Sequence, residues 1–278
     1  MKADRAWMAA FREAYPGWYG RARGLLERGD DDAALAGYPF PAVGAPPWAP
    51  VWGALEAARL GVVTTARLWR PGADSPPARS IEGDARVVEI PSESRPGILQ
   101  IAHPELALSP AGADINLVLP LEHLQALVRE GRLANLARQF FSVDGHRARA
   151  DTVAEETAPA IAGSMWEDGV TAALIIPVCP RCHQTAGLIA REVEATGIPT
   201  VMMASAPEWV ARIRPPRWAQ IHFPAGTMFG EPGNASQQRR VLEEVLGAFR
   251  CVQQPGGHVE VPEVWVGRRT GRALNEAA

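Results

Sequence analysis

Two of the three cysteines in this chain stand three residues apart and are followed directly by a histidine, in the stretch VCPRCHQTAGL at 178–188. A Cys-x-x-Cys-His string is compatible with a haem attachment site, half of a metal site, a redox dithiol or an activated nucleophile. In the last three uses the reactive form of cysteine is the thiolate. The elements that surround Cys179, Cys182 and His183 therefore decide which chemistry the string supports.

The two cysteines lie between an expected strand and an expected helix. VTAALIIPV (170–178) is a continuous apolar run, as in a strand buried on both faces of a parallel sheet. CHQTAGLIAREVEATG (182–197) has the pattern of a helix that ends at Gly197. Ligands of parallel α/β sheets bind beyond the carboxyl ends of the strands. A helix N-terminus and the neighbouring Arg181 favour a thiolate, so this position suits a nucleophilic or redox cysteine.

Other interpretations of the string remain open. Haem attachment requires export, and the N-terminal stretch lacks the apolar core of a signal peptide, so we expect a cytoplasmic protein without haem. A structural zinc site usually combines two such half-sites, and only one is present. A mixed zinc site of Cys179, Cys182, His103 and His183 stays possible, as does a purely structural pair of small residues. His183 either supports the thiolate and moves a proton, or caps the helix.

Composition excludes several classes of function. Hydrophobic residues make up 47% and charged residues 21% of the chain, as in ordinary globular enzymes. The net charge of −3 and the dispersed basic residues give no indication of nucleic-acid binding. No apolar run reaches the roughly 18–20 residues that a membrane span needs. Three cysteines in a cytoplasmic chain argue against a disulfide framework, which makes a chemical role for the pair more probable than a structural one.

The order of elements predicts an α/β fold. IPTVMMA (198–204) and RWAQIHFP (217–224) are expected strands, and SQQRRVLEEVLGAFRCV (236–252) is the last expected helix. LANLARQFFSV (133–143) is interpreted as a helical or turn segment. We predict parallel sheets flanked by helices, in two flavodoxin-like or racemase-like lobes with the site at the carboxyl ends of the strands. The predicted parts are an N-terminal helix with a proline-rich connector (1–54), a first lobe (55–148) and a second lobe with the cysteines (149–278).

Polar residues end two further strand-like runs. Thr64 and Thr65 follow a buried run and are candidates for binding a substrate carboxylate opposite Cys179, although threonines at strand ends often have no such role. His103 follows ILQIA and is a candidate acid or base. Each of these side chains has an alternative structural interpretation.

The cysteine motif also carries a family resemblance. VCPRCHQTAGLIAREVEATGIPTV, preceded by DGVTAALIIP, resembles the selenoprotein B family of the glycine, sarcosine, betaine and D-proline reductases. In those relatives a selenocysteine precedes a cysteine by three positions, followed by His-Gln and a glycine-bearing helix. Cys179 stands where the selenocysteine would be, and Cys182 matches the partner cysteine. RQFFSVDG and IHFPAGTMFGEPGNASQQRRVLEEVL are similar as well, and the likeness covers roughly residues 55–250.

The resemblance implies reductive cleavage of a C–N or C–S bond in a small amino acid or an amino-acid-derived compound. Cys179 would be the nucleophile and Cys182 the resolving thiol, with electrons from an external thiol or a thioredoxin-like donor. Gln184 and Thr185 of the same motif become candidates for substrate binding. The family's reductases work with partner proteins, including a pyruvoyl-bearing subunit, so a partner subunit or electron-donor protein is possible here. We also expect a homo-oligomer, and no contact with nucleic acid or membrane.

Two rival functions follow from the same residues. One is a non-redox cysteine enzyme, either racemase-like or a desulfhydrase that releases sulfide from a thiocarbonyl heterocycle, with or without the assistance of a metal. Sulfur in place of selenium favours this rival, because a thiol is the poorer nucleophile. The other is a non-catalytic subunit that binds a partner or a metal through Cys179 and Cys182.

Overall fold

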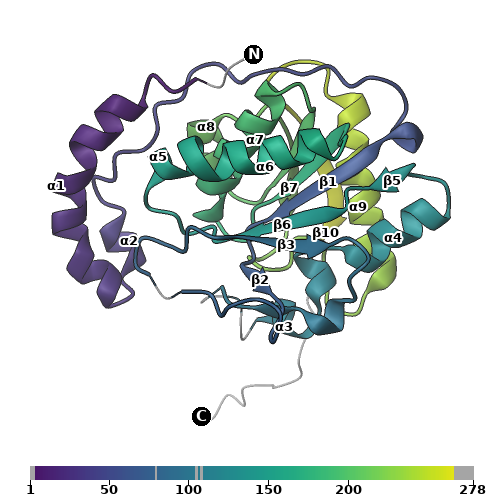
Figure 1. The fold of residues 1–278 in the computed structure, drawn as a ribbon, viewed down its shortest axis with the longest axis horizontal. Helices are drawn as coiled ribbons and strands as arrows, with labels where there is room; N and C mark the ends of the chain where they lie inside the picture. The colour runs from purple at the N-terminus through teal and green to yellow at the C-terminus, as the bar shows by residue number, and fades with distance from the viewer. Residues whose placement is uncertain (1–3, 79, 104–105, 107–108, 266–278) are drawn as a thin grey trace, which may run out of the picture.

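In the computed structural model, which describes residues 4–78, 80–103, 106 and 109–265, strands from both halves of the chain join in one sheet (Figure 1). Its order is β10-β9-β8-β7-β1-β6-β3, and β5 pairs with the first residues of β1. All neighbours are parallel except β3, which runs antiparallel to β6. The strands of this sheet are β1 (Arg59–Thr64), β3 (Val87–Pro91), β5 (Asn135–Leu136), β6 (Gln139–Val143), β7 (Ala172–Ile176), β8 (Thr200–Ala204), β9 (Arg217–His222) and β10 (Gly257–Val264).

Helices cover both faces of the sheet (Figure 1). On one face α7 packs on β7 and β8 and carries α6 beside it, and on the other α9 packs on β8, β9 and β10 with α4 beside it. Two short strands, β2 (Leu68–Trp69) and β4 (Gln100–Ile101), form a separate antiparallel pair. The α-helices are α1 (Met8–Glu27), α2 (Asp31–Ala34), α3 (Pro110–Ala113), α4 (Leu121–Arg129), α5 (Ala150–Thr152), α6 (Ala158–Glu167), α7 (Cys182–Ala195), α8 (Pro207–Ile213) and α9 (Ala235–Cys251). The short 3-10 helices are Leu55–Ala57, Pro96–Ile98 and Ile115–Leu117, and a π-helical turn at Val153–Thr157 joins α5 to α6.

The central strands are buried on both faces, as the apolar runs predict. Every residue of β7 (AALII) and of β8 (TVMMA) is buried. Parallel strands covered by helices on both sides need such uninterrupted apolar sequence, because neither face meets water. The predicted α/β class, a mostly parallel sheet flanked by helices, is confirmed. Within the described part of the chain, no helix is both long enough and apolar enough to cross a lipid bilayer.

The structure differs from the sequence-based expectation in three places. LANLARQFFSV, expected as helix or turn, forms β5 and β6 instead, and the expected last helix is followed by a further strand, β10. The expected lobes 55–148 and 149–278 share one sheet, because β1 of the first pairs along its length with β7 of the second. A division into folding units at residue 149 stays a prediction, and its last stretch, 266–278, lies outside the described residues.

The proline-rich connector of the N-terminal segment is fixed to the far end of α7 by a buried ion pair. Arg217 on β9 and Glu194 near the end of α7 form this pair at 2.6 Å, and both side chains are almost fully buried. The Ala49 N–H donates to Glu194 Oε1 at 2.7 Å, and Arg217 donates to the Ala49 carbonyl. The Arg217 guanidinium also lies 3.6 Å from the centroid of the Trp48 ring. The connector is thus extended and fixed in place, and α1 and α2 flank the sheet at the left of Figure 1.

Candidate active site at the carboxyl edge of the sheet

Four buried or half-buried side chains with sulfur or nitrogen donors meet at one point. Cys179 and Cys182 form a disulfide with a Cα–Cα distance of 5.1 Å. His146 Nε2 lies 3.1 Å from Cys179 Sγ, and His103 Nε2 lies 3.4 Å from Cys182 Sγ. All four donor atoms lie within 4.8 Å of one another. The two sulfurs can therefore store and release two electrons beside the two imidazoles, or all four side chains can hold a metal ion once the sulfurs are reduced.

Three of the four residues follow the carboxyl end of a strand, and the fourth begins a helix. Cys179 lies in the turn after β7, and Cys182 is the first residue of α7. His146 follows β6, which lies two strands from β7 across β1, and His103 follows β4. The Cys182 N–H points at Cys179 Sγ at 3.3 Å, as expected for a sulfur at a helix N-terminus. The predicted location of the site, at the carboxyl ends of parallel strands, matches this geometry.

Burial keeps both imidazoles neutral. Burial lowers the pKa of His103 to about 3, and the adjacent His146 contributes to the shift. Burial also lowers the pKa of His146 to about 3, assisted by the positive charges of Arg181 and Arg67. A neutral imidazole keeps a lone pair that accepts a proton or binds a metal. The second ring nitrogen of His103, Nδ1, is buried without a hydrogen-bond partner.

His183 has a different surrounding from the one expected. Its Nδ1 lies 2.9 Å from the carbonyl oxygens of both Cys179 and Pro180, and its Nε2 accepts the Ser205 N–H at 3.1 Å. Because both ring nitrogens bind backbone groups, His183 connects the cysteine turn to the end of β8. Burial lowers the pKa of His183 to about 4, so this ring is neutral too. In the donor cluster His146 takes the position expected for His183, and a catalytic role for His183 stays a prediction.

The three predicted threonines bind backbone groups around the cysteines. The Thr64 hydroxyl donates to the Val118 carbonyl at 2.9 Å, and Thr65 Oγ1 accepts the Val178 N–H at 3.0 Å. The Thr185 hydroxyl donates to the Gly145 carbonyl at 2.9 Å. All three side chains are fully buried. They connect the end of β1 to the segments that follow Leu117 and β7, and α7 to the loop after β6, and substrate binding by them stays a prediction.

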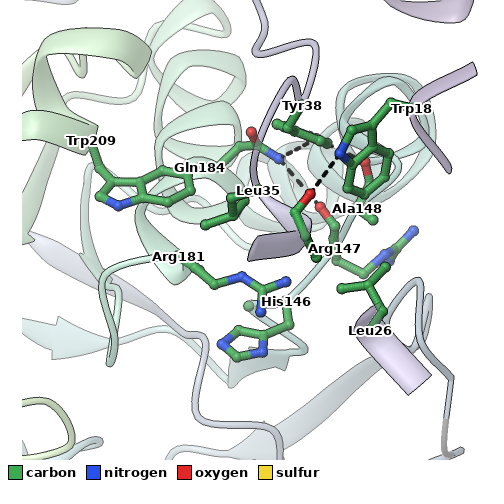
Figure 2. A pocket seen from close by; sticks show the side chains of 12 residues that line it. Trp18, Leu26, Leu35, Tyr38, His146, Arg147, Ala148, Arg181, Gln184 and Trp209 are labelled. Carbon is green, nitrogen blue, oxygen red and sulfur yellow. Dashed lines mark hydrogen bonds between the residues drawn. The ribbon is translucent and has the colours of Figure 1, made fainter. Parts of the chain in front are cut away.

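Gln184, the fourth predicted binding residue, lines a narrow pocket beside the cysteines (Figure 2). Its Nε2 donates to Tyr38 Oη at 2.9 Å and to the Arg147 carbonyl at 3.3 Å. Its Oε1 is buried and has no partner. The pocket lies between the N-terminal segment, the loop after β6, the cysteine turn and α8. The residues that line it are Trp18, Leu26, Ala34, Leu35, Tyr38, Gly145, His146, Arg147, Ala148, Arg181, Gln184 and Trp209.

The loop after β6 supplies two site residues that the sequence interpretation missed. A Cβ on Gly145 would overlap Cys182 Sγ and crowd the Thr65 side chain, so only glycine lets this loop approach the cysteines closely. His146 follows directly and reaches Cys179. The signal was present in the sequence, because the segment RQFFSVDG ends at Gly145 and the next residue is a histidine.

Comparison with known proteins relates this site to amino-acid reductases. The chain is 28% identical over 223 residues to D-proline reductase subunit gamma of Acetoanaerobium sticklandii, covering 80% of this chain and 91% of that subunit. Two Peptoclostridium acidaminophilum proteins match over shorter stretches. The beta subunit of sarcosine reductase complex component B is 32% identical over 92 residues, and that of betaine reductase complex component B is 25% identical over 109 residues.

The chain is homologous to a D-proline reductase subunit over most of its length. The predicted resemblance is thereby confirmed, with the match to the gamma subunit extending over most of both chains. The chain spans only 21% and 25% of the sarcosine and betaine proteins. All three relatives are named as subunits of reductases, so a reductase-related role is supported. No family model and no solved structure matches the chain.

Proposed function

We propose that this protein is a thiol-dependent reductase that cleaves a C–N or C–S bond in a small amino acid or an amino-acid-derived compound. The observation that carries the proposal is the Cys179–Cys182 pair, which closes a disulfide beside the neutral imidazoles of His146 and His103. A dithiol that forms a disulfide at a helix N-terminus is suited to deliver two electrons. The reductase subunits among the relatives support the same class of reaction.

The proposed reaction has two steps. The Cys179 thiolate attacks the substrate carbon, an S–C bond forms, and the amine or thiol leaves with a proton. The Cys182 thiolate then attacks Cys179 Sγ, the S–C bond breaks, and the carbon takes up a proton. The substrate gains two electrons and the enzyme is left as the disulfide. His146 and His103 lie within reach of the two sulfurs, and as neutral imidazoles they accept hydrogen bonds from the two thiols.

An external reductant restores the dithiol after each cycle. We propose a small thiol or a thioredoxin-like protein of the cytoplasm, where such donors keep thiols reduced. A partner subunit and a homo-oligomer belong to the same proposal, since the relatives are subunits of reductases. Cys179 and Cys182 are almost fully buried, so the donor reaches them through a pocket or after a local opening.

Cysteine variants test this function. Reduced, metal-free protein is incubated with dithiothreitol and with D-proline, glycine, sarcosine or betaine, and products and protein adducts are followed by mass spectrometry. We expect Cys179→Ser to lower turnover on the order of 10³-fold or more. Cys182→Ser should accumulate an adduct on Cys179, and Cys251→Ser should behave like the wild type. Full turnover by Cys182→Ser would instead favour the non-redox cysteine enzyme, and complete inertness of the reduced protein would favour a non-catalytic subunit.

A metal site is the second candidate, and the four donors around the disulfide favour it. Two sulfurs and two neutral imidazoles form a donor set typical of Zn²⁺, which would be held by Cys179, Cys182, His103 and His146. A zinc ion there would supply Lewis-acid chemistry for a racemase-like or desulfhydrase reaction. Titration of the reduced protein with Co²⁺ tests this candidate, because thiolate coordination gives intense absorption. We expect His146→Gln to lose the signal and His183→Gln to keep it, and no signal in the wild type would contradict the candidate.

A further inference from the structure

The charged side chains that line the pocket beside the cysteines are all positive. Among the described residues that line it are two arginines, Arg147 and Arg181, and no aspartate or glutamate. Figure 2 shows the Arg181 guanidinium next to the His146 ring, and His146 Nε2 lies 3.1 Å from Cys179 Sγ. Such a lining attracts an anionic group.

Gln184, one of the residues that line the pocket, has a side-chain acceptor without a donor. The Gln184 side chain is almost fully buried, and its Oε1 has no hydrogen-bond partner although its Nε2 has two. The two contacts of Nε2 fix the orientation of the carboxamide, since Nε2 donates to the Arg147 carbonyl, which only accepts. Leaving a buried acceptor unsatisfied is unfavourable, and native structures retain such groups mostly where a ligand or an ordered water completes them.

We propose that this pocket binds a small carboxylic acid that also carries an N–H group, with Arg181 holding its carboxylate and Gln184 Oε1 accepting its N–H. The inference rests on the proposed function and deepens it by assigning the residues that select the substrate. His146 lines the pocket and lies 3.1 Å from Cys179 Sγ, so a ligand held there is one side chain away from the nucleophile.

The N-terminal segment belongs to this binding site. Trp18 of α1 and Tyr38 of the connector line the pocket from one side, and Trp209 of α8 lines it from another. The Trp18 indole N–H donates to the Ala34 carbonyl, and the Tyr38 hydroxyl donates to the Ala148 carbonyl, both at 2.8 Å, so these walls are fixed. Apolar walls exclude water and thereby strengthen an ion pair between a carboxylate and a guanidinium.

Two alkylating reagents of equal size test the carboxylate partner. Iodoacetate carries a carboxylate and iodoacetamide is its neutral counterpart, and Cys251 serves as an exposed reference thiol in the same molecule. The rate ratio of iodoacetate to iodoacetamide, mapped by peptide mass spectrometry on reduced protein, should be about tenfold higher at Cys179 than at Cys251, as for one charge-assisted hydrogen bond. Arg181→Gln should abolish this preference and Arg181→Lys should retain part of it. Arg212→Gln is the matched control, because Arg212 lies over the Phe40 ring outside the pocket lining.

A second pair of probes tests the N–H partner. Proline, as either enantiomer, and cyclopentanecarboxylate share a ring and a carboxylate, but only proline has an N–H group. We expect proline to protect Cys179 from iodoacetamide at a lower concentration than cyclopentanecarboxylate does, and Gln184→Met to remove the difference. Equal protection by both compounds, or the same reagent ratio at Cys179 and Cys251, would overturn the inference. Failure of Cys179 to react with either reagent would instead overturn the proposed nucleophile.

Discussion

Helix α7 carries a buried polar cluster at each end, and the two clusters are built differently. At its C-terminal end both carboxylate oxygens of Glu194 are satisfied: Oε1 binds the Ala49 N–H and Arg217, and Oε2 binds the N–H and the hydroxyl of Thr200. At its N-terminal end, beside Cys182, His103 Nδ1 and Gln184 Oε1 remain buried without partners.

The difference separates a cluster whose carboxylate is fully paired from one that we propose binds a ligand or metal. The paired Glu194 carboxylate fixes the connector against α7 and β9, although Arg217 Nε is buried there without a hydrogen-bond partner. Burial raises the pKa of Glu194, whereas Arg217 and the bonds from Ala49 and Thr200 oppose the shift, so this carboxylate depends on all of its partners. Buried groups without partners are rare in native proteins, and the two at the N-terminal end lie beside the disulfide and the four clustered donor atoms, which supports the proposed binding role of this end.

The largest expected effect on stability is at the structural cluster. Glu194→Gln removes the charge that balances Arg217 and should lower the free energy of unfolding by about 3–5 kcal/mol. The double variant Glu194→Gln with Arg217→Met should recover much of the loss, because no unpaired charge stays buried. Urea denaturation of the reduced protein measures both. Alkylation of Cys179 at 25 °C should be unchanged in the folded variants, and a loss below about 1 kcal/mol would contradict the comparison.

A middle-sized effect is expected where the β6 loop meets the cysteines. Gly145→Ala places a methyl group against Cys182 Sγ and should destabilise the protein by about 1–3 kcal/mol. It should also change the alkylation rate of Cys182, since the thiol has to move. Gly163→Ala is the control, because Gly163 is exposed on α6 with no atom within 4 Å of the added Cβ, and helix propensity predicts a gain of about 0.5–1 kcal/mol. Equal unfolding midpoints for the two variants would refute the close approach.

The smallest effect is expected at the aromatic partner of the ion pair. Trp48→Leu removes the ring beneath the Arg217 guanidinium and should cost about 0.5–2 kcal/mol. Trp52→Leu is the matched control, since Trp52 is 83% exposed and its replacement should stay within about 0.5 kcal/mol of the wild type. Thermal denaturation of the two variants side by side sharpens the view that the connector is fixed by specific contacts. Equal melting temperatures of the Trp48→Leu and Trp52→Leu variants would contradict this view.

The sequence predicts those site residues whose positions depend on a pattern within a short stretch of chain. Cys179 and Cys182 lie where an apolar run meets a helical pattern, and both features are local in the chain. The sequence also predicts that His103 follows a strand-like run. The family likeness added the pairing of the two cysteines and the reductase class, which no spacing rule supplies.

His146 was missed because β6 was missed. In LANLARQFFSV the apolar residues Leu133, Leu136, Phe140 and Phe141 recur at a spacing that also suits a helix, so periodicity favours the wrong element. What makes β6 a strand is its place between β1 and β3, which depends on residues far away in sequence. Likewise His183 adjoins Cys182 in the chain, yet its ring is turned to backbone groups, which no sequence pattern reveals.

The central position of β1 has a consequence for how the chain folds as it is synthesised. β1 is the first strand of the sheet to leave the ribosome, but it pairs with β6 at Thr64 and Ser142 and with β7 at Leu60 and Ala172. Contacts between residues so distant in sequence form slowly, because a long loop has to close first. A buried apolar strand therefore has no sheet neighbour until Asn135 and Gln139, the first residues of β5 and β6, are made, and it lacks β7 until Ala172. The nascent chain is most prone to aggregation in that interval.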